Sequence, residues 1–197
     1  MVSTLDKVAV FTKELSYIKD SRILENSKKM INMIPDYFFE VPASSTGKYH
    51  PPFAQGDGGL IRHTKAAVRI AYEILSSACL CNDYSDIDRD LVIIGLIMHD
   101  SCKYGLEKGK YTVVNHPMIA AKLIRDNKDS LTLTEDELNL LTGMIEAHMG
   151  PFNKDFKGNV LMPLPKNKYE KFVHMCDLLA SKKFLDIRFN EDNEIVE

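Results

Sequence analysis

The sequence predicts an all-α protein: a single helical bundle with an N-terminal helical extension. Apolar residues recur at spacings of three and four over several long stretches, which is the period of an amphipathic helix. Helix-capping signals precede three of these stretches, and beyond short pieces no segment shows the pattern of a strand. With 197 residues, one domain with a substantial core is expected.

The N-terminal part, residues 1–57, is expected to pack on the core as helices and a loop. Two amphipathic helices are predicted over about 3–18 and 22–34, and Pro35 ends the second. The stretch 36–59 holds three prolines and four glycines, so it predicts a long irregular loop. His50 lies in this loop, either as an exposed histidine or as a contact to a substrate.

The core is expected to begin with a helix over about 60–80, on which His63 shares the apolar face with Leu60 and Ala67. The next helix starts after a cap at Ser85 or Asp86 and carries an apolar run that ends in His99 and Asp100. These two polar residues continue the buried faces of that helix. Burying either one without a partner would be costly.

Three further helices complete the predicted bundle. One runs from His116 to about Asp126 behind an Asn115 cap, and the next follows a Thr134–Glu137 capping box to about residue 149, with His148 on its apolar face. The last spans about 166–183, and Asp177 lies on its inward face. Residues 184–197 form an acidic tail.

Together these helices bring polar side chains to faces that should be core. Imidazole and carboxylate without thiolate suit iron, manganese or zinc, and six ligands exceed the need of one open catalytic metal. Two metal ions with a shared carboxylate fit the number better. The predicted ligands are His63, His99, Asp100, His116, His148 and Asp177.

Five motifs carry a resemblance to a known family. In order they are GGLIRHT (58–64), IMHDSCK (97–103), NHPMIAAKLI (115–124), IEAHMG (145–150) and CDLLAS (176–181). This H…HD…H…H…D order resembles the binuclear branch of the HD-domain metal-dependent phosphohydrolase superfamily, and it covers residues 58–181. The resemblance implies an HD-domain helical bundle over residues 58–183. The segment 42–64 is most similar to exoribonuclease-like bacterial HD proteins, and the branch also includes bacterial HD phosphodiesterases.

The resemblance also implies how two divalent transition-metal ions would be held. His63, His99 and Asp177 would bind one ion, His116 and His148 the other, and Asp100 would bridge them. Manganese or iron is expected, and zinc, nickel and cobalt stay open.

The expected function is a phosphodiesterase that acts on a nucleotide, cyclic nucleotide or short oligonucleotide through a hydroxide activated by two metals. Asp100 and Lys103 are the expected catalytic residues. Lys103 would stabilise charge on the phosphate, unless it is a surface lysine at a helix end. His50, Arg62, Lys65 and Lys103 are the expected contacts to the substrate.

Two other functions stay open from the sequence. They are a nucleotidase or dNTP triphosphohydrolase, and a mixed-valence di-iron oxygenase of the HD type. The presence of all six predicted ligands argues against a non-catalytic binding domain. The residues that bind metal would be the same in the hydrolases and the oxygenase, so ligand identity does not separate them.

Charge and composition limit the kinds of molecule that the protein is expected to bind. A net charge of −3 argues against strong duplex nucleic-acid binding, whereas lysine clusters near 103–110 and 154–171 suit a small phosphorylated substrate. No apolar run reaches the ~20 residues of a membrane span and no signal-peptide core is seen, so a cytoplasmic protein is expected. The four cysteines are read as structural thiols, and a homo-oligomer is left open.

Overall fold

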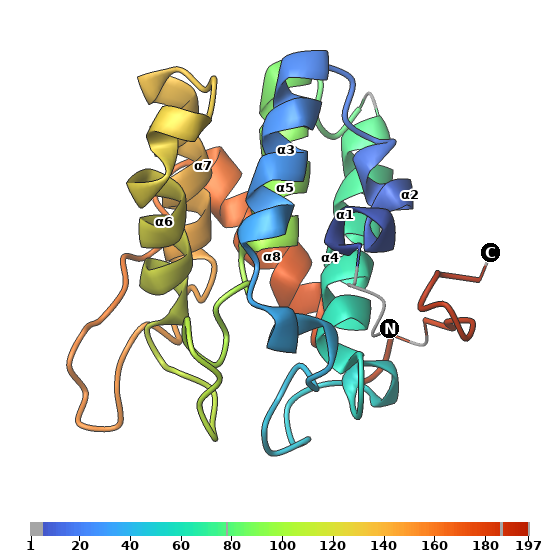
Figure 1. The fold of residues 1–197 in the computed structure, drawn as a ribbon, viewed down its shortest axis with the longest axis vertical. Helices are drawn as coiled ribbons and strands as arrows, with labels where there is room; N and C mark the ends of the chain where they lie inside the picture. The colour runs from blue at the N-terminus through green and yellow to red at the C-terminus, as the bar shows by residue number, and fades with distance from the viewer. Residues whose placement is uncertain (1–5, 78, 186, 197) are drawn as a thin grey trace.

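The protein is an all-helical bundle, as predicted. The structure, a computed structural model, describes residues 6–77, 79–185 and 187–196 (Figure 1). Within these residues there are α-helices, short 3₁₀ turns and two isolated β-bridges, but no strand. The α-helices are α1 (Lys7–Val10), α2 (Thr12–Leu15), α3 (Ser21–Met33), α4 (Gly59–Ser76), α5 (Asp86–Met98), α6 (His116–Asp126), α7 (Glu135–Ala147) and α8 (Lys168–Ala180).

Helix α5 lies at the centre of the bundle. Ser85 caps it in a reciprocal box with Asp88, as the sequence predicted for this position. Every residue from 90 to 98 is buried, because α3, α4, α7 and α8 all pack around the helix. A helix that is apolar on all sides can only be stable in such a position.

The N-terminal helices share one hydrophobic core with the rest of the bundle. The prediction of one continuous helix over 3–18 is wrong in part, because the helix breaks at Phe11 into α1 and α2. Residues 1–5 of that prediction lie outside the described residues. Helix α3 packs on α5, and the Asp90 carboxylate of α5 accepts hydrogen bonds from the backbone N–H groups of Lys19 and Asp20. These bonds satisfy the turn that leads into α3.

The segment 36–59 is less irregular than its glycines and prolines suggested. Its first residues form a 3₁₀ turn, η1 (Asp36–Phe39), whose three aromatic side chains are buried, and a second turn, η2 (Pro52–Ala54), precedes α4. The Tyr37 hydroxyl donates to the Gly105 carbonyl at 2.5 Å and accepts from the Tyr104 N–H at 3.1 Å. The start of this segment is therefore fixed to the loop that follows α5.

Three long loops leave the bundle at one end, at the bottom of Figure 1. We call this the loop end. Helix α4 begins there and α5 ends there, while α6 begins there and α7 ends there. The three loops are 41–58, 104–115 and 149–167.

The acidic tail folds back onto α4. Phe189 and Ile195 form an antiparallel bridge, and the Phe189 ring lies 5.4 Å from that of Phe53. No helix in the described ranges has both the length and the apolar character that crossing a membrane requires.

Candidate metal centre

Six imidazole and carboxylate side chains meet at the loop end of the bundle. They come from α4 to α8. Helices α4 to α7 contribute residues at or near the end that lies on this side, and α8 contributes one from its interior. Five of the six are buried and Asp177 is nearly so. The six side chains are His63 of α4, His99 and Asp100 after α5, His116 at the start of α6, His148 after α7, and Asp177 of α8.

One half of the centre is formed around Asp177. Its Oδ1 atom lies 2.9 Å from His63 Nε2 and 3.5 Å from His99 Nε2. One ligand atom from each of these three residues lies within 4.8 Å of the other two. Metal bonds of about 2.0–2.2 Å place neighbouring ligand atoms about 3–4 Å apart, so the spacing fits one ion.

The other half is formed around Asp100. Its Oδ1 atom lies 2.8 Å from His116 Nε2 and 3.5 Å from His148 Nε2. Its Oδ2 atom points the other way, 3.4 Å from His99 Nε2 and 3.7 Å from His63 Nε2. The two oxygens of one carboxylate thus face two different groups of imidazoles, which is the arrangement of a bridging ligand.

Three of the histidines are held with one nitrogen aimed into the centre. The Nδ1 atoms of His99, His116 and His148 each lie 2.6–2.7 Å from the carbonyl three residues earlier in the chain. A neutral imidazole that donates Nδ1–H to a carbonyl keeps its lone pair on Nε2, where it can bind a metal ion. These three Nε2 atoms and Asp100 Oδ1 are buried without a hydrogen-bond partner. Unpaired buried acceptors are costly, and a metal ion satisfies them.

The charges of the centre also favour a cation. Burial alone would raise the pKa of Asp100, but the Lys103 ammonium and the imidazoles hold that pKa well below its ordinary value. Burial opposes ionisation of Asp177 too, yet the hydrogen bond from His63 and the nearby His99 imidazole hold its pKa well below its ordinary value. Both carboxylates are therefore ionised and act only as hydrogen-bond acceptors or metal ligands. Four imidazoles and two carboxylates form a donor set suited to manganese, iron or zinc.

Lys103 and His50 lie directly beside the ligands. Lys103 is buried, with Nζ 2.5 Å from Asp100 Oδ2, so it is not a surface lysine. The His50 ring lies edge-on to His63 with 4.8 Å between ring centroids. Burial, with His63 and Lys103 nearby, lowers the pKa of His50 to about 3, so its imidazole is neutral at physiological pH.

The structure places Arg62 and Lys65 away from the centre. His63 faces the centre, and neighbours one and two positions along a helix turn to other sides. Arg62 donates to the Phe53 and Gln55 carbonyls and to Asn193 Oδ1. Lys65 is fully buried and pairs with Glu194, with Glu14 Oε2 at 3.7 Å. Their donors are used within the protein, so we leave both out of the proposed site.

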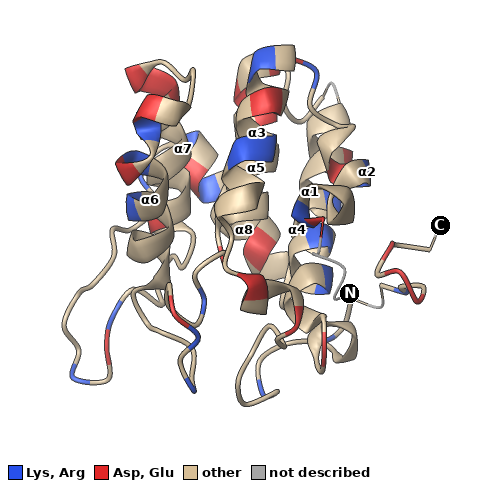
Figure 2. Cartoon of the chain, viewed as in Figure 1, with Lys and Arg blue, Asp and Glu red and all other residues tan. Residues whose placement is uncertain are grey.

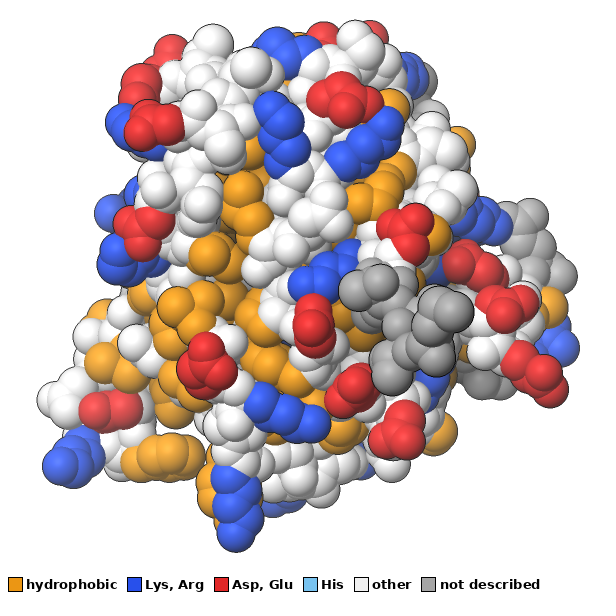
Figure 3. All heavy atoms as spheres, in the orientation of Figure 1, with side chains coloured by type: hydrophobic (Ala, Val, Ile, Leu, Met, Phe, Trp, Pro, Cys, Tyr) orange, Lys and Arg blue, Asp and Glu red, His pale blue; other side chains and the backbone are white. Residues whose placement is uncertain are grey.

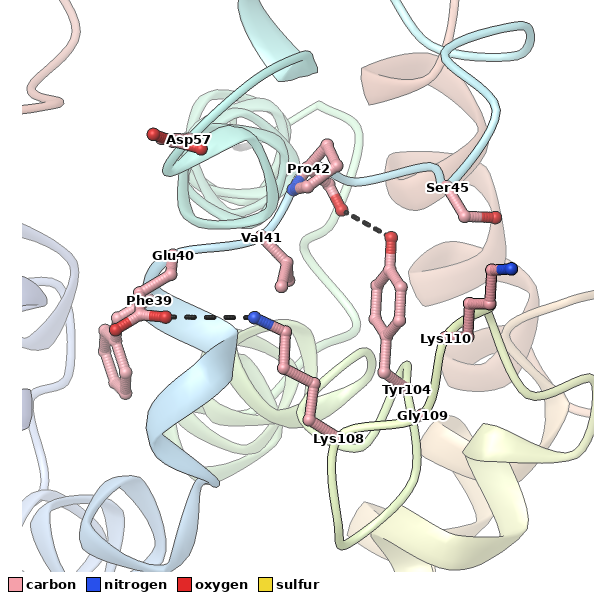
Figure 4. A pocket seen from close by; sticks show the side chains of 10 residues that line it. All are labelled: Phe39, Glu40, Val41, Pro42, Ser45, Asp57, Tyr104, Lys108, Gly109 and Lys110. Carbon is pink, nitrogen blue, oxygen red and sulfur yellow. Dashed lines mark hydrogen bonds and ion pairs between the residues drawn. The ribbon is translucent and has the colours of Figure 1, made fainter.

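A groove opens at the loop end between η1 and the 104–115 loop, and none of the six candidate ligands lines it (Figure 4). It encloses about 650 Å³ and includes Tyr104, whose hydroxyl donates to the Pro42 carbonyl at 3.4 Å. Lys108 and Lys110 line it from the loop. The sequence did not predict this groove, since the only local signal was that Tyr104 directly follows Lys103.

Comparison with known proteins finds distant relatives. The curated proteins it matches include the 3′-5′ exoribonuclease YhaM of Listeria welshimeri and of Listeria monocytogenes, each 24% identical over 185 residues. The match covers 89% of this chain but 54% of each relative, so the chain spans about half the length of the curated relatives it matches. No family model matches the chain. No solved structure matches it either. Within the described residues, the buried cluster of imidazoles and carboxylates supports a metal site.

Proposed function

We propose that the chain is a metal-dependent phosphohydrolase that cleaves a phosphodiester bond in a nucleotide or a short oligonucleotide. The observation that carries the proposal is the bridging position of Asp100. Its two oxygens face two groups of imidazoles, and three buried Nε2 atoms around them have no partner. We assign His63, His99 and Asp177 to one ion and His116 and His148 to the other.

Two divalent ions bound at this centre would supply a hydroxide nucleophile at neutral pH and polarise the phosphoryl group. The chain's own residues orient the reactants. Asp100 stays ionised beside Lys103, and the imidazoles are fixed by their Nδ1 hydrogen bonds. The Lys103 ammonium can also stabilise charge that develops on the phosphate oxygens. His50 is a neutral imidazole at the edge of the centre, where it can contact a bound phosphate.

The similarity to proteins named exoribonucleases favours a diester over a monoester as the bond cleaved. The groove beside Tyr104 has a volume within the range of about 300–1,000 Å³ typical of small-molecule sites, so it could hold a nucleoside. Manganese and iron remain the metals we expect, because oxygen and imidazole donors suit both.

Hydrolysis of bis(p-nitrophenyl) phosphate and of p-nitrophenyl phosphate, each with manganese, tests the proposal. We expect cleavage of the diester that is lost with EDTA and falls at least 100-fold in Asp100→Asn. The matched control is Asp126→Asn, which removes an exposed carboxylate paired with Lys122 on α6 and should leave the rate unchanged.

Two outcomes would contradict the proposal. Cleavage of the monoester alone would indicate a nucleotidase. Absence of both activities from metal-loaded protein, with iron-dependent uptake of dioxygen, would indicate an oxygenase instead.

A further inference from the structure

Each of the three loops at the loop end exposes an aromatic ring next to a lysine. The pairs are Lys48–Tyr49 in the 41–58 loop, Lys110–Tyr111 in the 104–115 loop and Phe156–Lys157 in the 149–167 loop. We call these three pairs the rim. Phe152, with no lysine next to it, is a fourth exposed ring in these loops. Exposed apolar side chains that gather in one region mark an interaction site.

The rim aromatics are strongly exposed. The exposed fraction is 66% for Tyr49, 61% for Tyr111 and 100% for Phe156. Two of the lysines already lie near their own rings, with Lys48 Nζ 5.4 Å from the Tyr49 centroid and Lys110 Nζ 5.3 Å from that of Tyr111. Each such pair presents a flat apolar face and a positive charge together.

The loops that carry the rim are also basic. The three loops together carry six lysines against Asp57, Glu107 and Asp155, whereas the whole chain has a net charge of −3. The Asp155 carboxylate is turned back onto its own loop, where it accepts from the Asn159 side chain and from backbone N–H groups. Lysines lie at the lower turns of the loops in Figure 2, and hydrophobic and basic side chains adjoin at this end in Figure 3.

Each loop that carries a rim pair is connected at one end to the candidate metal centre. The 104–115 loop joins Lys103 to His116, and the 149–167 loop begins directly after His148. The 41–58 loop contains His50 and leads into α4, which carries His63. A chain-like ligand held by the rim would therefore lie at the same end of the bundle as the centre.

We propose that the rim binds single-stranded nucleic acid, with bases stacked on Tyr49, Tyr111 and Phe156 and phosphates near the adjacent lysines. Stacking on exposed rings beside a basic groove is how proteins hold single strands without reading their sequence. A duplex keeps its bases stacked inside and cannot use these rings, which agrees with the acidic net charge of the rest of the chain. The inference rests on the proposed function, and it makes the substrate a single strand several nucleotides long.

Fluorescence anisotropy with a 5′-labelled 12-nucleotide oligouridylate, in EDTA so that no hydrolysis occurs, tests the rim directly. We expect Tyr49→Ala, Tyr111→Ala and Phe156→Ala each to raise Kd about fivefold or more. Tyr111→Phe should bind like wild type, since stacking uses the ring and not the hydroxyl. A matched 12-base-pair duplex should bind at least tenfold more weakly than the single strand.

The matched control is Phe184→Ala, since Phe184 is 77% exposed but lies outside the three loops. Equal weakening by Phe184→Ala, or unchanged binding in all three rim variants, would overturn the inference. So would rim variants that alter self-association by size-exclusion chromatography while oligonucleotide binding stays the same. Because this assay measures binding without metal, its failure is distinct from a wild type that fails to cleave bis(p-nitrophenyl) phosphate.

Discussion

Lys103 is the residue whose charge lies closest to the Asp100 carboxylate. Its Nζ atom is 2.5 Å from Asp100 Oδ2, and the side chain is buried. We predict that Lys103→Met lowers kcat on a phosphodiester about 100-fold, because methionine keeps the apolar stem and removes the charge that would stabilise the transition state. Steady-state kinetics with manganese, together with elemental analysis of bound metal, measures the effect.

Metal content separates two roles of Lys103. We expect Lys103→Met to retain its metal, which would agree with a direct role toward the phosphate. A variant that loses metal would show that Lys103 acts only by holding Asp100. Lys122→Met, on the exposed side of α6, is the control for removal of a lysine and should match wild type in both measurements.

At the scale of the element, Glu137 joins two helices. It closes the capping box of α7 with Thr134 and also accepts two hydrogen bonds, at 2.6 and 2.8 Å, from Arg22 of α3. We predict that Glu137→Gln lowers the free energy of unfolding by about 1 kcal/mol at pH 7, since Arg22 is partly exposed and its ion pair is screened. Urea unfolding followed by circular dichroism measures this difference.

The effect of Glu137→Gln should depend on pH in one direction. The hydrogen bond from Arg22 lowers the pKa of Glu137 below its ordinary value of 4.5. The contribution of the ionised carboxylate is therefore complete above pH 4.5 and disappears as the pH falls through the folded-state pKa. Wild type and variant should differ at pH 7 and converge as the pH falls below the folded-state pKa of Glu137. Glu135→Gln, in the same helical turn but in an exposed pair with Lys128, should change stability by less than about 0.5 kcal/mol throughout this range of pH.

The elements that the sequence predicted well are those with local signals. Ser85 and Thr134 each cap a helix in a box with the residue three positions later. Both helix starts could therefore be predicted from the sequence, and both are confirmed. The break at Phe11 and the burial of Tyr37 depend instead on long-range packing. No periodicity within residues 3–39 encodes those contacts.

The candidate centre follows the same rule at the scale of the whole molecule. Five of its histidines and aspartates could be proposed because each lies on an apolar face, and His116 because it lies at a predicted helix start. Both are local patterns. Arg62 and Lys65 were expected to contact the substrate because they lie on the same helix as His63. Their partners, Asn193 and Glu194, are about 130 residues away in the tail, and no local pattern shows that the tail folds back onto α4.

The contact between Lys65 and Glu194 means that the tail stabilises α4. Lys65 is fully buried, and Glu194 is its nearest partner, with Glu14 Oε2 at 3.7 Å. We predict that Glu194→Ala lowers the free energy of unfolding by about 2–3 kcal/mol, because a buried charge loses a partner that is itself only partly buried. The control is Glu191→Ala, an exposed acidic residue of the same tail. Equal losses in the two variants by urea unfolding would show that only the net charge of the tail matters.

Metal binding should stabilise the whole bundle, since the candidate ligands come from five helices and the loops attached to them. A metal that binds only the folded chain adds about 2.7 kcal/mol at a concentration of 100 Kd, which corresponds to a rise in Tm of roughly 5–10 °C for a domain of this size. We predict this rise on addition of manganese and its reversal by EDTA, measured by differential scanning fluorimetry. The rise should be larger at pH 8 than at pH 6, because protons compete with the metal for the imidazoles. Asp100→Asn should lose the rise while Asp126→Asn keeps it. An equal rise in both variants would place the metal outside the proposed centre.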